Sequence, residues 1–293
     1  MKKGLKNKIK NEYLGRAYAT FCGMLIIILT ISIIYFITSK GIKLFTQNKQ
    51  SILEFLFSKV WDPEEKKYGA LIYILGSSAV SLGAVIISTP LAIALAIFMN
   101  MISPKLGEKV MQPAMELFVG IPSVVYGWIG ISVLVPIIKN YLGGLGFSLL
   151  AGILVLSVMI LPTITSIASD AIKTVPNEYI ESSYGLGATR WQTIKGIVVP
   201  SAKTGISTGI VLGLARAFGE ALAVQMVIGN ALRIPSKLLK PSSTLTGAIT
   251  MDMGNTVMGT EWNNALWSMA LLLLIISFIF ILIIRAISKR GEI

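Results

Sequence analysis

Six long apolar segments restrict what this sequence can fold into. A helix needs roughly 20 mostly apolar residues to cross the hydrocarbon core of a bilayer, and each segment meets that length. Backbone groups in lipid must satisfy their own hydrogen bonds, so such segments become helices. The sequence therefore predicts an all-α, polytopic membrane protein with six transmembrane helices. The segments cover about 19–38, 71–99, 113–138, 146–169, 204–229 and 264–285.

Composition excludes several classes of function. Apolar residues make up 54% of the chain and charged residues 14%, and the mean hydropathy is +0.75, so membrane lipid is the expected solvent. The net charge of +12 is scattered among the apolar segments, whereas a nucleic-acid-binding domain would gather it on one face. Because the chain has no histidine and only Cys22, we expect no metal site, no cofactor and no internal disulfide.

The distribution of Lys and Arg predicts an orientation. If the N-terminus is cytoplasmic, the segments on that side carry more of these residues than the segments outside. Cytoplasmic loops have this excess in membrane proteins generally, so we expect both termini inside. No small-residue cleavage site follows Phe36, which predicts that the first helix stays in place as an anchor.

Proline and glycine interrupt two of the apolar segments. One interruption is Gly120 to Ser123, and the other is Leu161 to Thr163. Broken helices at membrane depth are tolerated where they line a cavity or are buried in protein, so Ser123 and Thr163 are candidate pathway residues. The alternative is a packing kink in which Ser and Thr hydroxyls satisfy the freed carbonyls.

A polar loop at 172–203 separates the fourth and fifth segments. Pro176 can open a short helix from Asn177 to about Tyr184, which glycines at 185 and 187 can end in left-handed geometry. Thr189 and Gln192 have the spacing of a capping box and predict a second short helix. Two such helices form a docking surface, although local chemistry alone also fits an amphipathic turn lying on the membrane.

The spacing within this loop carries a family resemblance. Glu181-Ser182-Ser183 is followed after three residues by Gly187, and nine residues later by Ile-Val-Val-Pro ending at Pro200. This resembles the signature loop of ABC importer permeases, in which the two serines are usually alanines and the second-last residue is leucine. The resemblance implies that Glu181, Ser182, Ser183 and Gly187 couple the chain to an ATPase, whose groove receives the short helix.

Two further motifs narrow the resemblance to phosphate permeases. Residues 117–127 resemble the third-span motif of that family, and 215–223 resemble its Arg-Ala-Ile-Gly-Glu-Thr motif with departures at Phe218 and Ala221. Residues 159–165 and 227–230 favour the PstC type over its PstA sister. The resemblance runs from about residue 70 to the C-terminus.

The resemblance implies a fold, an activity and a set of partners. The fold is the MetI-like permease fold of a type I ABC importer, in the bacterial inner membrane. The activity is translocation of inorganic phosphate by alternating access. The partners are a PstA-like second permease, two copies of an ATP-binding subunit and an extracytoplasmic phosphate-binding protein. The sequence lacks Gly, four residues, Gly-Lys-Ser/Thr, so we expect no enzyme activity here and ATP hydrolysis on the separate subunit.

The expected organisation has three parts. Residues 1–70 hold a cytoplasmic tail, the first helix and the first extracytoplasmic loop. Residues 71–285 form the permease core with five helices and the coupling loop at 172–203. Residues 286–293 form a cytoplasmic tail.

Charges within the fifth segment are candidate substrate contacts. Arg216 and Glu220 are four residues apart, which would place them on one face of a continuous helix. Arg216 would lie ~18 Å in from Thr204, near the bilayer centre, where a charged side chain costs roughly 2.5 to 3.5 kcal/mol on insertion scales. Either Arg216 contacts the phosphate oxyanion and Glu220 holds it between passages, or the pair neutralises itself and fixes helix packing.

Three other hypotheses about function stay open. A permease for molybdate or sulfate would share most of these features, and the motif around Arg216 argues against it. An ion-coupled secondary transporter would use Arg216 and Glu220 as a relay, but such a carrier has no ATPase for the coupling loop to contact. A structural scaffold would move no solute.

Overall fold

The computed structural model describes residues 13–289, with side chains to residue 286. The basic tail expected at 1–12 and the last residues of the C-terminal tail, 290–293, lie outside the described residues. The long helices are α2 (Leu14–Gly41), α5 (Leu71–Ile97), α10 (Leu149–Lys173), α14 (Lys203–Gly219) and α17 (Glu261–Lys289). The shorter helices, in chain order, are α3 (Lys43–Thr46), α4 (Ile52–Phe57), α6 (Pro104–Leu106), α7 (Gln112–Gly120), α8 (Ser123–Ile129), α9 (Val135–Leu142), α11 (Asn177–Gly185), α12 (Arg190–Thr193), α13 (Val199–Ser201), α15 (Leu222–Ile228) and α16 (Leu245–Asp252).

Short irregular elements join these helices. Four five-residue π-helical segments are η2 (Phe98–Ile102), η3 (Gly107–Met111), η4 (Gly130–Leu134) and η5 (Ile194–Val198), and η6 (Met253–Asn255) is a 3₁₀ turn. Two short antiparallel strands, β1 (Trp61–Asp62) and β2 (Lys67–Tyr68), pair Trp61 with Tyr68.

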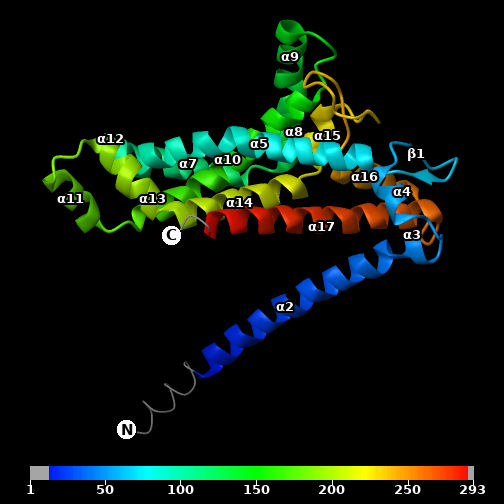
Figure 1. Cartoon of the computed structure of the whole chain (residues 1–293), viewed down its shortest axis with the longest axis horizontal. Helices are drawn as coiled ribbons and strands as arrows, with labels where there is room; N and C mark the ends of the chain where they lie inside the picture. Colours follow the sequence, from blue (N-terminus) through cyan, green and yellow to red (C-terminus); the bar gives the residue numbers. More distant parts are fainter. Residues whose placement is uncertain (1–12, 290–293) are drawn as a thin grey trace.

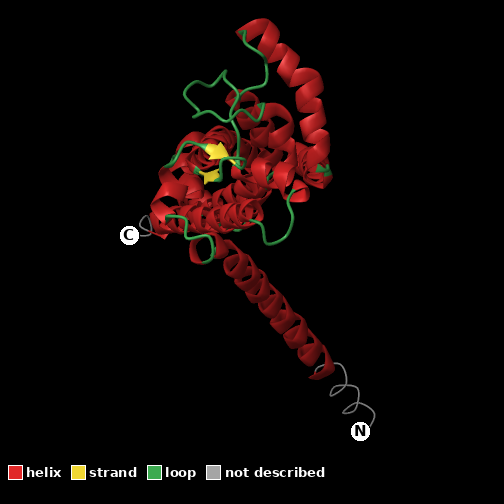
Figure 2. Ribbon diagram, turned by 90° about the vertical axis from the view of Figure 1, so that its right-hand side faces the viewer, coloured by secondary structure: helices red, strands yellow, loops and turns green. Residues whose placement is uncertain are grey.

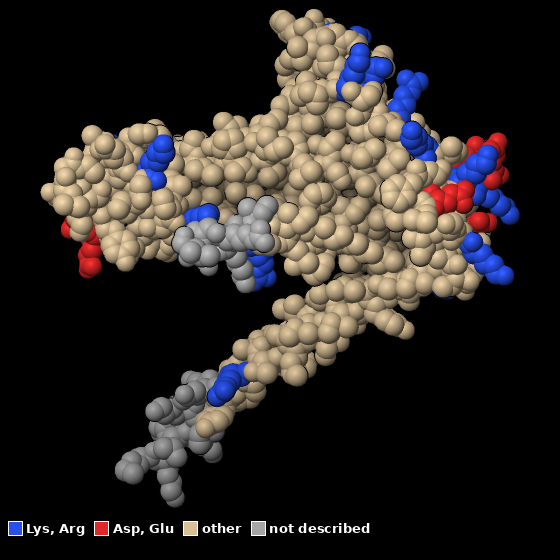
Figure 3. Space-filling view, viewed as in Figure 1, with Lys and Arg blue, Asp and Glu red and all other residues tan. Residues whose placement is uncertain are grey.

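The predicted all-helical membrane fold is confirmed. Within the described residues, five helical segments are long and apolar enough to cross a membrane. The bent pair 190–201 and 203–219, which turns by 67°, adds a sixth if it is counted as one span. Helices α5, α10, α14 and α17 run together along the long axis of the molecule (Figure 1). The charged side chains visible on one face lie mostly toward its two ends, with a broad uncharged band between them (Figure 3).

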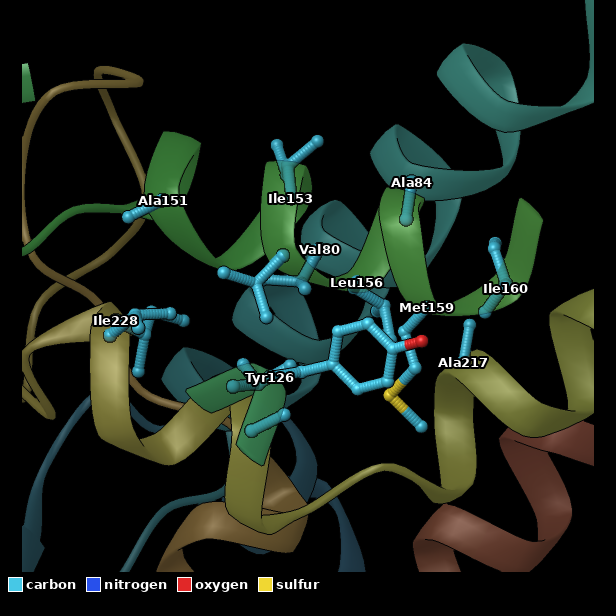
Figure 4. Packing of buried hydrophobic residues seen from close by; sticks show 14 of the residues in the cluster. Val80, Ala84, Tyr126, Ala151, Ile153, Leu156, Met159, Ile160, Ala217 and Ile228 are labelled. Atoms are coloured by element: carbon cyan, nitrogen blue, oxygen red, sulfur yellow. The ribbon is translucent and has the colours of Figure 1, made fainter. Parts of the chain in front are cut away.

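Helix α10 lies at the centre of the packing. It packs against α5, α14 and α15, and its inward side chains Leu156 and Ile160 are fully buried (Figure 4). Small residues let the backbones approach closely, since a Cβ on Gly213 of α14 would lie 2.6 Å from Ile164 of α10. Glycine at such contacts is the usual means of close helix packing in lipid.

The two ends of the bundle differ in structure. Helices α11 and α12 form one end, and β1, α4 and α16 form the other (Figure 1). Figure 2 looks onto the second end, where the two strands and several loops lie over helices seen end-on. At this end Trp61, Tyr68 and Tyr73 pack edge to face around a small buried cluster of their own.

Helix α2 leaves the bundle (Figure 1). No residue in its most apolar 18-residue stretch is buried. It contacts α17 near its C-terminal end, where Phe36 and Trp267 meet edge to face at 5.3 Å and Ser268 donates to the Gly41 carbonyl at 2.6 Å. The long apolar surface of α2 is therefore available to lipid or to another membrane chain.

The two proline interruptions behave differently. The third span breaks after α7, where Ile121 and Pro122 are extended, and α8 begins at Ser123. Pro162, in contrast, lies inside α10, which continues to Lys173. The Thr165 hydroxyl donates to the Leu161 carbonyl at 2.8 Å, as expected for a proline accommodated by packing and local hydroxyls.

The prediction of a continuous fifth helix is wrong. Helix α14 ends at Gly219, the Glu220 backbone is extended (φ −75°, ψ 126°), and α15 begins at Leu222. Arg216 and Glu220 therefore do not share one helix face. The Glu220 side chain has a local role instead, because its Oε1 accepts from the Ala223 N–H at 3.0 Å in the first turn of α15.

Candidate functional site

Arg216 lies in the last turn of α14 and joins that helix to α10. Its Nη1 donates to the Thr163 hydroxyl at 2.8 Å, and the side chain is partly buried. Among the described residues, Arg216 forms no ion pair, so the predicted pairing with Glu220 is not formed. Two of the four candidate pathway residues, Arg216 and Thr163, thus come together from segments far apart in the sequence.

Two hydrogen bonds of Glu220 stabilise the break in the fifth span. Its carboxylate caps α15, and its backbone carbonyl accepts a hydrogen bond from the Thr246 hydroxyl of α16 at 2.9 Å. An extended residue between two helices leaves carbonyls and amides without helical partners, and these two contacts satisfy one of each. The break is consequently fixed both locally and by α16.

The break in the third span lies beside α15. Helix α8 packs against α15 through Gly127, where a Cβ would lie 2.6 Å from the Met226 sulfur. The Tyr126 hydroxyl donates to the Phe118 carbonyl at 2.7 Å, across the Ile121–Pro122 break. Both half-helices therefore start close to each other within the bundle.

Tyr126 is a site residue that sequence reasoning missed. Its ring reaches from α8 toward Met159 of α10 (Figure 4), and its hydroxyl bridges the break in the third span. The available signal was its place in the 117–127 motif. Ser123 opens α8 and is partly buried, but within the described residues it makes no hydrogen bond with Arg216 or Thr163.

This arrangement can bind an anion. A guanidinium has five N–H donors and stays protonated, and only one of the donors of Arg216 is directed at Thr163. Because no carboxylate pairs with it among the described residues, its charge is available to a ligand. The described residues include no group of three or more His, Cys, Asp or Glu side chains arranged to hold a metal ion.

The coupling loop has the local structure that its sequence predicts. Helix α11 covers Asn177–Gly185, Gly187 has φ +84°, and the capping box of Thr189 and Gln192 is present in full. Gly185 differs from expectation because it remains in the helix.

Side-chain contacts fix this loop to the bundle. The Ser183 and Thr193 hydroxyls lie 3.0 Å apart and join α11 to the last residue of α12. Arg190 donates to the carbonyls of Met101 and Ile102 at the end of η2, the latter at 3.2 Å. These contacts connect α11, through α12, to η2 at the end of the second span.

The outer surface of the loop is apolar and open. Leu186 is 90% exposed and Trp191 is 64% exposed, and Glu181 and Ser182 are exposed on α11 while Ser183 is buried. Leu186 and Trp191 are therefore candidate contacts for another protein. Leu186 carries no distinguishing signal in the sequence, because only the fold shows that it is exposed.

Known proteins resemble this chain over most of its length. A "Probable ABC transporter permease protein YqgH" of Bacillus subtilis (strain 168) is 51% identical over 98% of this chain and 94% of its own length. A "Phosphate transport system permease protein PstC" of Mesorhizobium japonicum is 36% identical over 85% of this chain and 84% of its own length. A "Probable phosphate transport system permease protein PstC" of Methanocaldococcus jannaschii is 29% identical over 78% of each.

Solved structures share the fold. A chain of a bacterial ABC transporter involved in the import of the acidic polysaccharide alginate superposes with a TM-score of 0.64 over 99% of both chains, at 17% identity. An inward-facing MetNI methionine ABC transporter superposes with a TM-score of 0.56 over 80% of this chain and all of the other, at 18% identity.

The family match covers most of the permease core. Residues 88–292 match the "Binding-protein-dependent transport system inner membrane component" family, and this range includes both broken spans and the coupling loop. In ABC importers of this kind a separate subunit hydrolyses ATP and a binding protein delivers the substrate. The chain belongs to this family and is a multi-pass permease subunit of an ABC importer.

Proposed function

We propose that this chain is the permease subunit of an ATP-driven importer of inorganic phosphate. The observation that carries the proposal is Arg216, an arginine within a membrane-spanning helix that donates to Thr163 and has no acidic partner among the described residues. The phosphate permeases among its relatives support this substrate, whereas its 51% identical relative is named only as an ABC permease.

The residues at the two breaks have separate roles in this proposal. Arg216 contacts a phosphate oxygen, because a guanidinium fits phosphate geometry. Thr163 orients the guanidinium through its hydroxyl. Glu220 is kept away from the oxyanion because its carboxylate caps α15. Ser123 lines the pathway at the start of α8.

The partners follow from the same proposal. The second permease is PstA-like and covers the exposed face of α2, two ATPase copies bind the coupling loops, and a phosphate-binding protein docks at the opposite end. When the ATPase subunits close on ATP, α11 moves with them. The contacts of Arg190 with η2 move the end of the second span at the same time. Both termini are cytoplasmic, so α11 and α12 face the cytoplasm. ATP then favours one of two pre-existing states of the pathway.

The test is uptake of radiolabelled phosphate by proteoliposomes that contain the whole complex. Wild-type uptake should require ATP and exceed uptake of sulfate and molybdate, and this chain purified alone should hydrolyse no ATP. Arg216→Met should lower phosphate uptake by at least about tenfold while ATPase subunits still assemble, and Arg216→Lys should restore part of it. Equal import of sulfate or molybdate, or near-normal phosphate uptake by Arg216→Met, would refute the proposal.

A further inference from the structure

A cavity of about 420 Å³ lies at the end of the bundle opposite α11 and α12. The β1–β2 turn, the start of α5, the loop after α15, helix α16 and the start of α17 all contribute to it. It has no part in the pathway around Arg216. The side chains that decide its chemistry are Trp61, Glu64, Tyr73, Asn230, Asp252 and Trp262.

Aromatic side chains form the walls of this cavity. Trp61 and Tyr73 are buried and meet edge to face, with ring centroids 5.5 Å apart, and Trp262 lies on the α17 side. The Trp61 and Tyr73 rings are held in fixed positions by this contact. Aromatic faces attract ammonium and guanidinium groups, more strongly when the cation is removed from water.

The charged groups of the cavity are both acidic. Asp252 is partly buried at the end of α16, and Glu64 lines the cavity from the hairpin turn. No Lys or Arg lines it, and neither carboxylate has an ion-pair partner among the described residues. Burial raises the pKa of the Asp252 carboxyl, which is the effect of desolvating a carboxylate that lacks a cation.

Two polar atoms at this site lack hydrogen-bond partners. The Trp262 indole N–H and the Asn230 side-chain oxygen are both buried without a partner. Asn230 also has a left-handed backbone (φ +49°), which is uncommon for a residue other than glycine. A buried donor or acceptor without a partner is costly, so the packing around these two residues is not optimised for stability.

We propose that this cavity receives a Lys or Arg side chain of the substrate-binding protein when that protein docks. The cation would lie against the aromatic walls of the cavity and donate to the Asp252 carboxylate. The negative charge of the cavity and its place at the end remote from the coupling loop favour this occupant over a lipid or an anion. The inference rests on the orientation in the proposed function and is independent of phosphate as the substrate.

The test measures docking directly on the complete complex in nanodiscs with its purified binding protein. Asp252→Asn keeps the shape of the side chain and removes the charge, and it should weaken docking by at least about tenfold, which corresponds to about 1.4 kcal/mol. Glu54→Gln is the matched control, since Glu54 is exposed on α4 at the same end and does not line the cavity. It should change docking less than about twofold.

Assembly and charge reversal exclude simpler explanations. Removing a desolvated carboxylate should leave assembly with the ATPase unchanged, and if Asp252→Asn nevertheless fails to assemble, Glu64→Gln on the exposed turn tests the same charge. Asp252→Lys should abolish docking, and one Lys→Glu or Arg→Glu change on the binding protein should restore it.

If Asp252→Asn docks the binding protein within about twofold of the wild type, the inference is overturned. The same conclusion holds even if free arginine still changes Trp262 fluorescence, because the cavity would then bind only a small cation. A complex that docks its binding protein and imports no phosphate would refute the proposed substrate and leave this inference standing.

Discussion

The contact between Arg216 and Thr163 leads to a quantitative prediction. A hydrogen bond that involves a charged group contributes about 1.5 to 3 kcal/mol. The partial exposure of Arg216 places this one toward the lower end, at about 1.5 to 2 kcal/mol. Arg216→Met and Thr163→Val should therefore be non-additive by about that amount. The geometry behind the figure is the 2.8 Å separation of Nη1 and Oγ1.

A second double-mutant cycle tests Arg216 with Glu220, where the first tests Arg216 with Thr163. Glu220→Gln removes the charge and keeps the oxygen that accepts from the Ala223 N–H, so helix α15 retains its cap. Because Arg216 and Glu220 form no ion pair, the coupling free energy in this cycle should be clearly smaller than in the Arg216–Thr163 cycle.

Both cycles are measured as free energies of unfolding in mixed micelles with graded SDS, with phosphate uptake recorded for each variant. If Arg216 contacts phosphate, uptake should stay low in the variant that combines Arg216→Met with Glu220→Gln, although that variant assembles. A larger coupling in the Glu220 cycle than in the Thr163 cycle would refute the geometry. Near-normal uptake by the assembled double variant would refute the role of Arg216.

Two further predictions concern glycines. Gly76→Ala on α5 should destabilise the chain by about 1 to 3 kcal/mol in thermal unfolding, because the new Cβ would overlap the Ser243 carbonyl oxygen. Gly152→Ala should be neutral or stabilising in the same assay, because its Cβ would lie 3.5 Å or more from its neighbours. Gly187→Val should abolish uptake with normal membrane insertion, because its φ of +84° is strained for a side chain. Gly185→Ala, on helical backbone with open space around it, should retain uptake. Destabilisation by Gly152→Ala equal to that of Gly76→Ala, or normal uptake by Gly187→Val, would contradict the respective contact or turn.

Features that depend on neighbouring residues could be predicted before the structure was known. The apolar spans follow from length and hydropathy, and the capping box of Thr189 and Gln192 follows from a three-residue spacing. The left-handed turn at Gly187 likewise depends on the residue that stands there. In each case the interacting groups lie within one helical turn, so the local pattern specifies the structure.

The tertiary structure alone decided the arrangement at the centre of the membrane. The four-residue spacing of Arg216 and Glu220 fits a continuous helix, but Thr246 binds the Glu220 carbonyl from 26 positions away and Arg216 binds Thr163 from 53 positions away. In lipid, a polar group must find whichever partner the packed bundle brings to it. Local spacing contains no information about those distant partners, so the break at Glu220 and the free charge of Arg216 emerge only when α10, α14 and α16 are packed together.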